Sequence, residues 1–330
     1  DGIASRQDRA WGEKLWTMHR DMALRLQKDR PGVKLMITAY QVTREPPQTI
    51  ESLPDNVMVQ VAGPERDLLD RWQEQVDVPG GLSVYDYIWN PRYLPGRTVS
   101  EIEEKVQNYL DHGVRYLQNN AKAFVYGLKA INIYVFRRRL TDPDGKTAEQ
   151  LREEYLNAAY REAARPMDRF FRRLHQRLEP EFREAATRFG WKPQNRFFSI
   201  NALYTPALIN KLEQDLQQAE KADISSEAAR ERLKAARIEF DYLKHIANIV
   251  HLYNAYLVRR DEASLKAVMH AVAERNAWLE SLADESGRIR PGTPSFAYRH
   301  IRGLKQPRVE PFSWDVKSMD PAEYLSQETE

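Results

Sequence analysis

The 330-residue sequence contains no cysteine. This absence excludes disulfide bonds, thiolate metal sites and a cysteine nucleophile. A cysteine-free protein suits an oxidising and a reducing compartment equally, so the absence does not indicate where the protein resides.

Long apolar runs and an excess of one charge are also missing. No run approaches the roughly 18 residues typical of a membrane-spanning helix, so no membrane span is predicted. The 50 basic and 48 acidic residues nearly cancel, leaving a formal net charge of +2. This balance argues against nucleic acid or an anionic membrane as the main partner. The sequence shows neither a glycine-rich phosphate loop nor a GxSxG nucleophile motif.

The first 125 residues or so alternate between strand and helix patterns. An amphipathic helix pattern ends at Pro31-Gly32, and further helix patterns lie at 67–75 and 100–112. Short strands that alternate with helices predict βαβ units and a parallel sheet. The predicted strands are 34–40, 56–62, 82–89 and 114–121.

The sequence changes character after about residue 140. Thr147 and Gln150 fit a capping box, and a helical pattern continues from there to about Asp284. It includes one long helix over 226–260, and Asp261 is placed to cap the next helix. The last 45 residues or so are rich in proline, glycine and aromatic residues, which is typical of irregular structure. We therefore predict an α/β domain over 1–140, an α-helical domain over 141–290 and an irregular tail over 291–330.

Four parallel strands are few for a self-contained sheet. Parallel sheets are normally covered on both faces, and exposed edges favour unwanted pairing. Four βα units are also half of an eight-stranded barrel. The sequence thus leaves two alternatives, a small open α/β sheet or half of a barrel whose other half lies upstream of Asp1.

Several blocks are similar to those of a known bacterial family. The blocks KLMITAYQVTREPP, LPDNVMVQ, LSVYDYIWN, HGVRYLQNN and GLKAINIYVFRRRL resemble successive blocks of a family known only as a domain of unknown function. Its members resemble α-glucuronidases and related glycoside hydrolases, and the resemblance covers about residues 1–180. It implies the C-terminal half of a (β/α)8 TIM-type barrel followed by an all-α helical domain. It further implies a secreted or periplasmic protein that acts on carbohydrate without a metal or an organic cofactor.

Asp86 is the candidate catalytic residue. In a barrel the active site lies at the C-terminal ends of the strands, and glycoside hydrolysis uses two carboxyl groups. Asp86 is the one carboxylate within the predicted strands, so it is assigned as general base, nucleophile or acceptor from a sugar hydroxyl. The alternative is a structural role, in an ion pair with a neighbouring arginine or as a cap of backbone donors. We expect Tyr40, Gln60, Asp86 and Asn119 to surround one shared hollow.

Other residues near the strand ends suit a sugar ligand. Trp89 and Tyr93 would stack on sugar rings, and Asn119 with Asn120 would bind hydroxyls. Arg44 would pair with a uronic-acid carboxylate. The alternatives are ordinary packing, backbone capping and a solvated loop arginine, respectively. The predicted substrate-binding residues are Tyr40, Gln41, Arg44, Gln60, Trp89, Asn90, Tyr93, Asn119 and Asn120.

One position departs from the resembling family. That family often has a glutamate late in the last strand, where this chain has Asn119, and an amide cannot transfer a proton. The predicted function is therefore a glycoside hydrolase-like enzyme acting on poly- or oligosaccharides whose second carboxylate lies elsewhere. The alternatives are a non-catalytic glycan-binding protein and a scaffold that works through its long helices. Asp241 and His245 stand four residues apart, but without a third ligand they favour a structural hydrogen bond over a metal site.

Overall fold

The computed structural model describes residues 6–88, 94–119, 126–178, 196–296, 299–305 and 309–327. The described residues belong to two compact units. The sheet unit contains 6–88 and 103–119, and the helical unit contains 94–102 and the described residues from 126 onward.

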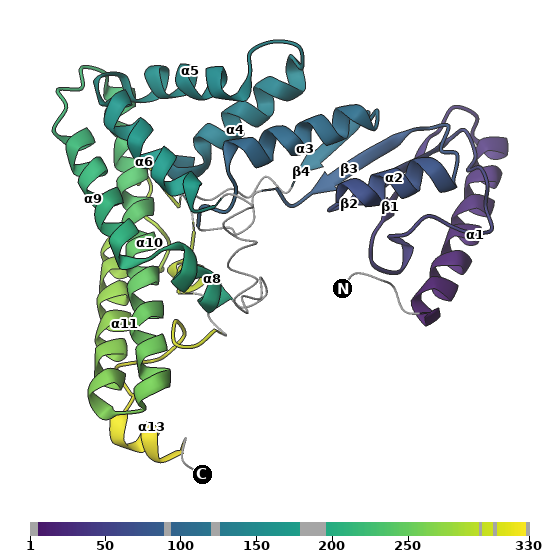
Figure 1. Cartoon of the computed structure of the whole chain (residues 1–330). Helices are drawn as coiled ribbons and strands as arrows, with labels where there is room; N and C mark the ends of the chain where they lie inside the picture. Colours follow the sequence, from purple (N-terminus) through teal and green to yellow (C-terminus); the bar gives the residue numbers. More distant parts are fainter. Residues whose placement is uncertain are drawn as a thin grey trace. The chain divides into compact units, whose positions relative to one another are not determined.

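Four parallel strands form the centre of the sheet unit, in the order β1-β2-β3-β4 (Figure 1). The parallel sheet predicted from the sequence is therefore confirmed. Three helices accompany it, and Gly113 follows the third with a positive φ of 58°, a conformation that favours glycine at the end of a helix. The strands are β1 (Leu35–Ala39), β2 (Val57–Ala62), β3 (Leu82–Asp86) and β4 (Tyr116–Asn119); the helices are α1 (Arg6–Asp29), α2 (Arg66–Gln75) and α3 (Val99–Asp111).

Alternation of side chains gives the sheet two different faces. One face, which we call the helix-covered face, carries Val59, Val61 and Val84, all fully buried. These valines share an apolar core with Trp16 of α1 and Trp72 of α2, whose rings meet edge to face at 5.2 Å. Burial of this face fixes which side of each strand points toward the helices.

The opposite face, which we call the open face, is polar and aromatic. Its edge positions are exposed, with Met36 of β1 at 54% and Tyr116 of β4 at 61%. Its central positions are covered by their own neighbours, because the Met36 sulfur lies 3.5 Å from Gln60 Nε2 and 3.8 Å from Ser83 Oγ. The open face consists of Met36, Thr38, Tyr40, Met58, Gln60, Ala62, Ser83, Tyr85, Tyr87, Tyr116 and Gln118.

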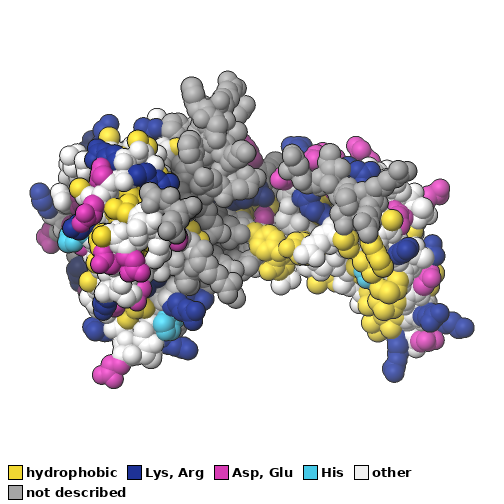
Figure 2. All heavy atoms as spheres, turned by 90° about the horizontal axis from the view of Figure 1, so that it is seen from below, with side chains coloured by type: hydrophobic (Ala, Val, Ile, Leu, Met, Phe, Trp, Pro, Cys, Tyr) yellow, Lys and Arg dark blue, Asp and Glu magenta, His cyan; other side chains and the backbone are white. Residues whose placement is uncertain are grey.

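Most of the large apolar side chains that are exposed among the described residues belong to the sheet unit. Helix α1 buries Trp16 but exposes Trp11, Met18 and Met22, which recur at helical spacing on its outer side. Figure 2, with the sheet unit on the right, shows hydrophobic side chains gathered in a band across the visible surface of this unit. Exposed large apolar side chains are thus concentrated on the sheet unit.

Helices build the helical unit around one long member, α10 (Glu227–Arg259), which packs against α4, α5, α8, α9 and α11 (Figure 1). Ser226 caps α10, and Asp261 caps α11, the latter as the sequence predicts. The continuous pattern after Thr147 is broken by a 3-10 turn at Arg161–Ala163, where Arg161 takes a φ of 51°. The other helices are α4 (Tyr126–Thr141), α5 (Ala148–Tyr160), α6 (Ala164–Gln176), α8 (Arg196–Leu203), α9 (Pro206–Glu220), α11 (Glu262–Leu282), α12 (Ile301–Leu304) and α13 (Pro321–Gln327).

A buried glutamate of α10 caps the first turn of α4. The Glu239 carboxylate accepts hydrogen bonds from the backbone N–H groups of Gly127 (2.8 Å) and Leu128 (2.6 Å) and from Ser295 Oγ (2.6 Å). Burial raises the pKa of Glu239 to about 7, although these hydrogen bonds favour the charged form. A Cβ on Gly127 would lie 2.6 Å from the backbone of α10 at Ala236. Glycine therefore permits the close approach that brings the carboxylate to the helix end.

His175 of α6 is a buried histidine beside Phe171, with ring centroids 5.9 Å apart. Its Nε2 has no hydrogen-bond partner among the described residues. Burial lowers the pKa of His175 to about 3 because the charged ring would lose its hydration, and the nearby Arg152 acts in the same direction. The folded protein consequently holds this ring neutral at pH values where an unfolded chain would protonate it.

We predict that His175 makes the protein sensitive to acid. Between its unfolded pKa of 6.5 and its folded pKa of about 3, only the unfolded chain binds this proton, so stability falls as the pH falls. His175→Gln should reduce the stability lost between pH 6.5 and 4.5 by at most about 3 kcal/mol, measured by urea unfolding. His270→Gln is the control, because the His270 side chain is 76% exposed. If the native protein and His175→Gln lost the same stability between pH 6.5 and 4.5, His175 would not be the source of the acid sensitivity.

Candidate functional site

Asp86 is the last residue of β3, and its side chain lies on the helix-covered face. It is 3% exposed. Its Oδ2 lies 3.2 Å from Lys105 Nζ and accepts a hydrogen bond from the Tyr109 hydroxyl, both from α3. Lys105 and Tyr109 stand one helical turn apart, so α3 presents both donors to the same oxygen. The carboxylate is therefore held in an ion pair of the kind named as the structural alternative, with a lysine in place of an arginine.

Asn119 belongs to the same face as Asp86. The two residues are register partners at the ends of β4 and β3, and Asn119 is half-buried. The adjacent Gln118 points to the opposite face, because neighbouring residues of a strand alternate.

Tyr40 and Gln60 lie on the open face instead. Gln60 is paired in register with Ser83, and Asp86 stands three residues beyond Ser83. An odd number of steps along a strand reverses the direction of the side chain. The four residues expected to share one hollow are thus divided between the two faces.

A pair of amides crosses the centre of the open face. Gln60 Nε2 donates to Gln118 Oε1 at 3.3 Å, and the Thr38 hydroxyl donates to Gln60 Oε1 at 3.4 Å. Gln60 is 5% exposed and Gln118 is exposed, so the pair extends from the centre of the sheet to the β4 edge. Both donors of Gln60 are used, on Gln118 and on the Met36 sulfur, so it is Gln118 that retains donor and acceptor capacity for a ligand.

Three tyrosines gather beside this pair, at the C-terminal ends of the strands. Tyr40 follows β1 in an extended conformation and is 48% exposed. The rings of Tyr85 and Tyr87 meet at 5.2 Å with an interplanar angle of 72°. Burial and the hydrogen-bonded Tyr40 raise the pKa of Tyr87. Ala62 is the register partner of Tyr85 and has only a methyl side chain, which leaves space beside the Tyr85 ring. We call Tyr40, Tyr85 and Tyr87 the tyrosine group.

Gln41 and Arg44 lie in the turn after β1. Gln41 begins the 3-10 helix Gln41–Thr43, is exposed, and has a φ of 52°. Arg44 Nη2 donates to the Gly63 carbonyl at 3.4 Å, and its Nη1 lies 3.9 Å from Glu45 Oε1. Its own carbonyl accepts a hydrogen bond from Trp72 Nε1. Arg44 is thus held within the sheet unit.

Four predicted site residues lie outside the described residues. They include the proposed stacking platform and the second amide of the Asn pair, so these assignments stay predictions. The four are Trp89, Asn90, Tyr93 and Asn120.

Sequence reasoning missed two sets of residues. Lys105 and Tyr109 recur at four-residue spacing on α3, and a lysine on the apolar side of a helix signals a buried acidic partner. Tyr85 and Tyr87 flank Asp86 at alternate positions, which places both on the face that Asp86 does not occupy. The contact of Lys105 and Tyr109 could not be predicted from local sequence, because their partner Asp86 lies on β3 and not on α3. The second set was assigned to the strand core rather than to a site.

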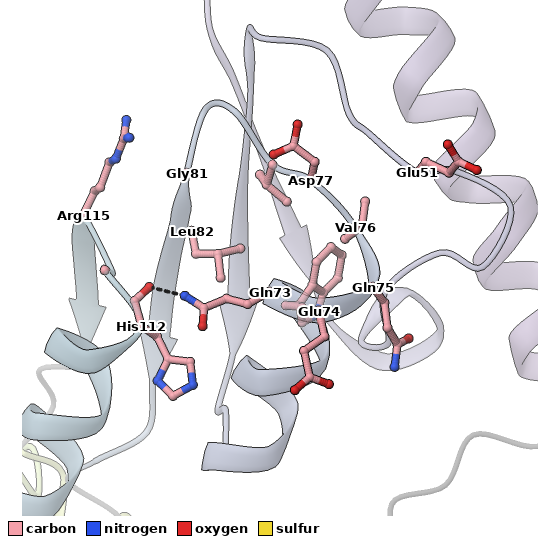
Figure 3. A pocket seen from close by; sticks show the side chains of 13 residues that line it. Glu51, Gln73, Glu74, Gln75, Val76, Asp77, Gly81, Leu82, His112 and Arg115 are labelled. Carbon is pink, nitrogen blue, oxygen red and sulfur yellow. Dashed lines mark hydrogen bonds between the residues drawn. The ribbon is translucent and has the colours of Figure 1, made fainter.

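A hollow of about 470 Å³ lies at the other end of the sheet, where β3 and β4 begin. In Figure 3, Gln73 donates to the carbonyl of His112 (2.9 Å), and Asp77 and Arg115 lie further along the rim. No predicted site residue lines this hollow. Ligands of parallel α/β sheets bind at the C-terminal ends of the strands, so we base the candidate site on the open face and its tyrosine group.

The described part of the chain contains no group of three or more histidine, aspartate or glutamate side chains that would hold a metal ion. Asp241 lies 3.4 Å from Arg237, and His245 packs on Trp278 with ring centroids 5.2 Å apart. Among the helices described, none has the length and apolar character of a membrane span.

Fold and site together define an α/β protein with a parallel sheet and a helical unit. Residues 7–172 match the model of a family described as a domain of unknown function, DUF4838. The chain belongs to this family. A search of curated proteins finds no match.

We predict that Asp86 stabilises the sheet unit. Asp86→Asn removes the charge that pairs with Lys105 and should lower the free energy of unfolding by about 1–3 kcal/mol, measured by denaturant titration. Asp111→Asn is the matched control, because Asp111 forms an exposed ion pair with Arg66 at 3.4 Å and such pairs contribute little. An Asp86→Asn protein as stable as the native one would show that the ion pair has no structural role.

Proposed function

We propose that this chain belongs to a carbohydrate-active protein and that the open face of its sheet binds the glycan. The tyrosine group beside the Gln60–Gln118 pair carries this proposal. Sugar rings present C–H groups that pack on aromatic faces, and their hydroxyls both donate and accept hydrogen bonds, as amides do. Half-exposed aromatic rings next to paired amides therefore suit a sugar better than a purely apolar ligand.

We further propose that the four strands are half of a (β/α)8 barrel. The strands follow one another in sequence order, as in a barrel, whereas doubly wound sheets reverse their order at a switch point. Helix residues Trp16, Trp72 and Tyr109 pack on one face only, which corresponds to the outer side of a barrel. The open face would then be the inner side, and further βα units would cover most of it, as parallel sheets require. The glycan would bind at its C-terminal rim, where the tyrosine group lies.

Binding is the activity that the described residues favour. Glycoside hydrolysis requires two carboxyl groups, and the open-face residues are uncharged at neutral pH. Asp86 lies on the opposite face with its carboxylate held by Lys105 and Tyr109. Cleavage would need carboxylates from other parts of the protein.

Hydrolysis through Asp86 is a second proposal. It is favoured by the position of Asp86 at the C-terminal end of β3, the level at which catalytic residues of barrel enzymes lie. In this case Lys105 and Tyr109 would hold the carboxylate in position for the reaction.

Removal of an exposed ring should weaken glycan binding. Tyr40→Ala should raise the Kd for a bound oligosaccharide by up to about 10-fold, because an aromatic contact contributes up to about 1.5 kcal/mol and about 1.4 kcal/mol is a factor of ten. Calorimetric titration with a panel of oligosaccharides measures the effect. Tyr126→Ala is the control, since Tyr126 is 56% exposed but lies on α4 of the helical unit. Unchanged affinity in Tyr40→Ala would remove the tyrosine group from the site.

Asp86→Asn distinguishes the two proposals. If the open face only binds, the variant keeps the native affinity for the oligosaccharide, and no turnover of the panel is detected with either protein. Product analysis by chromatography, together with the titration, measures both quantities. Turnover by the native chain that disappears in Asp86→Asn, with binding retained, would assign Asp86 to catalysis.

A further inference from the structure

We infer that the glycan bound by the open face is neutral rather than a uronic acid. The inference rests on the proposed glycan-binding function and specifies the class of its ligand. It differs from what an α-glucuronidase-like resemblance implies, because such enzymes act on acidic sugars.

The first observation is the chemistry of the open face. Every member of the face is a tyrosine, glutamine, threonine, serine, methionine or alanine. A uronate carboxylate placed against these side chains would lose water without gaining a cation, and an unpaired buried charge is costly. The hydroxyls of a neutral sugar gain hydrogen bonds from the same groups at a much smaller desolvation cost.

The second observation concerns Arg44, the cation nearest in sequence to the tyrosine group. Its guanidinium donates to the Gly63 carbonyl and pairs with Glu45. Glu45 is bound in turn by Arg71 at 2.9 Å, and Arg71 also pairs with Asp67 at 2.8 Å. This network holds two positive and two negative charges, so its charge is balanced.

A uronate that approached Arg44 would compete with Glu45 for the same guanidinium. A uronate that joined Glu45 at Arg44 would bring two carboxylates together around one cation, which is repulsive at short range. If the uronate drew the guanidinium away, the Gly63 carbonyl would also lose the hydrogen bond that it accepts from Arg44. Gly63 follows β2 and lies beside Tyr87. Arg44 thus acts as a support for the turn after β1, and the described residues of the open face offer an acidic ligand no cation.

The test is a titration of the intact chain with probes of equal length and different charge. The probes are cellohexaose, xylohexaose and hexagalacturonic acid, each measured at about 50 mM and about 500 mM NaCl. A neutral hexasaccharide should bind with a Kd that changes less than about twofold with salt, because screening affects only charge–charge contacts. Hexagalacturonic acid should bind at least about 10-fold more weakly than the better neutral probe.

Two variants complete the test. Tyr40→Ala should weaken binding of the neutral probe by up to about 10-fold, and Arg44→Gln should leave it within about twofold. Preferential binding of hexagalacturonic acid that weakens with salt and is lost in Arg44→Gln would overturn the inference of a neutral ligand while retaining the glycan-binding function. Absence of binding to all three probes would overturn both.

Discussion

The strict alternation of side chains along parallel strands is the constraint on which the sheet unit depends. Only one face of its sheet is covered by α1, α2 and α3, and that face holds the valines of β2 and β3. Because direction reverses at every residue, the buried valines also determine which neighbours face outward. Gln60 lies on the open side, and Asp86 lies beneath α3. The division of the candidate site is therefore a consequence of core packing.

The two deeply buried acids described above, Asp86 and Glu239, are used in the same way. Asp86 receives an ammonium and a phenol from α3, and Glu239 receives two backbone N–H groups of α4 and a serine hydroxyl. Each carboxylate links a helix to a neighbouring element through charge-assisted hydrogen bonds. A buried acid in an apolar stretch is consequently as compatible with architecture as with catalysis, and the donors around it decide between the two.

Much of the local structure follows from local sequence signals. The four strands, the capping box at Thr147 and the cap at Asp261 were predicted from the sequence, because residue periodicity and capping chemistry act over a few residues. The face of Asp86 was not readable, because it depends on the register between β2 and β3. Just before β3 the backbone also approaches Val57 so closely that a Cβ on Gly80 would overlap the Val57 carbonyl oxygen.

The cap on α4 also bears on the order in which the helical unit forms during synthesis. The acceptor for the Gly127 N–H lies 112 residues further along the chain, and Ser295 follows Glu239 by 56 more. A ribosome that has just released α4 has not yet made the group that completes its first turn. The first turn of α4 is therefore capped only after Glu239 and Ser295 have been synthesised, so its final structure depends on later parts of the helical unit.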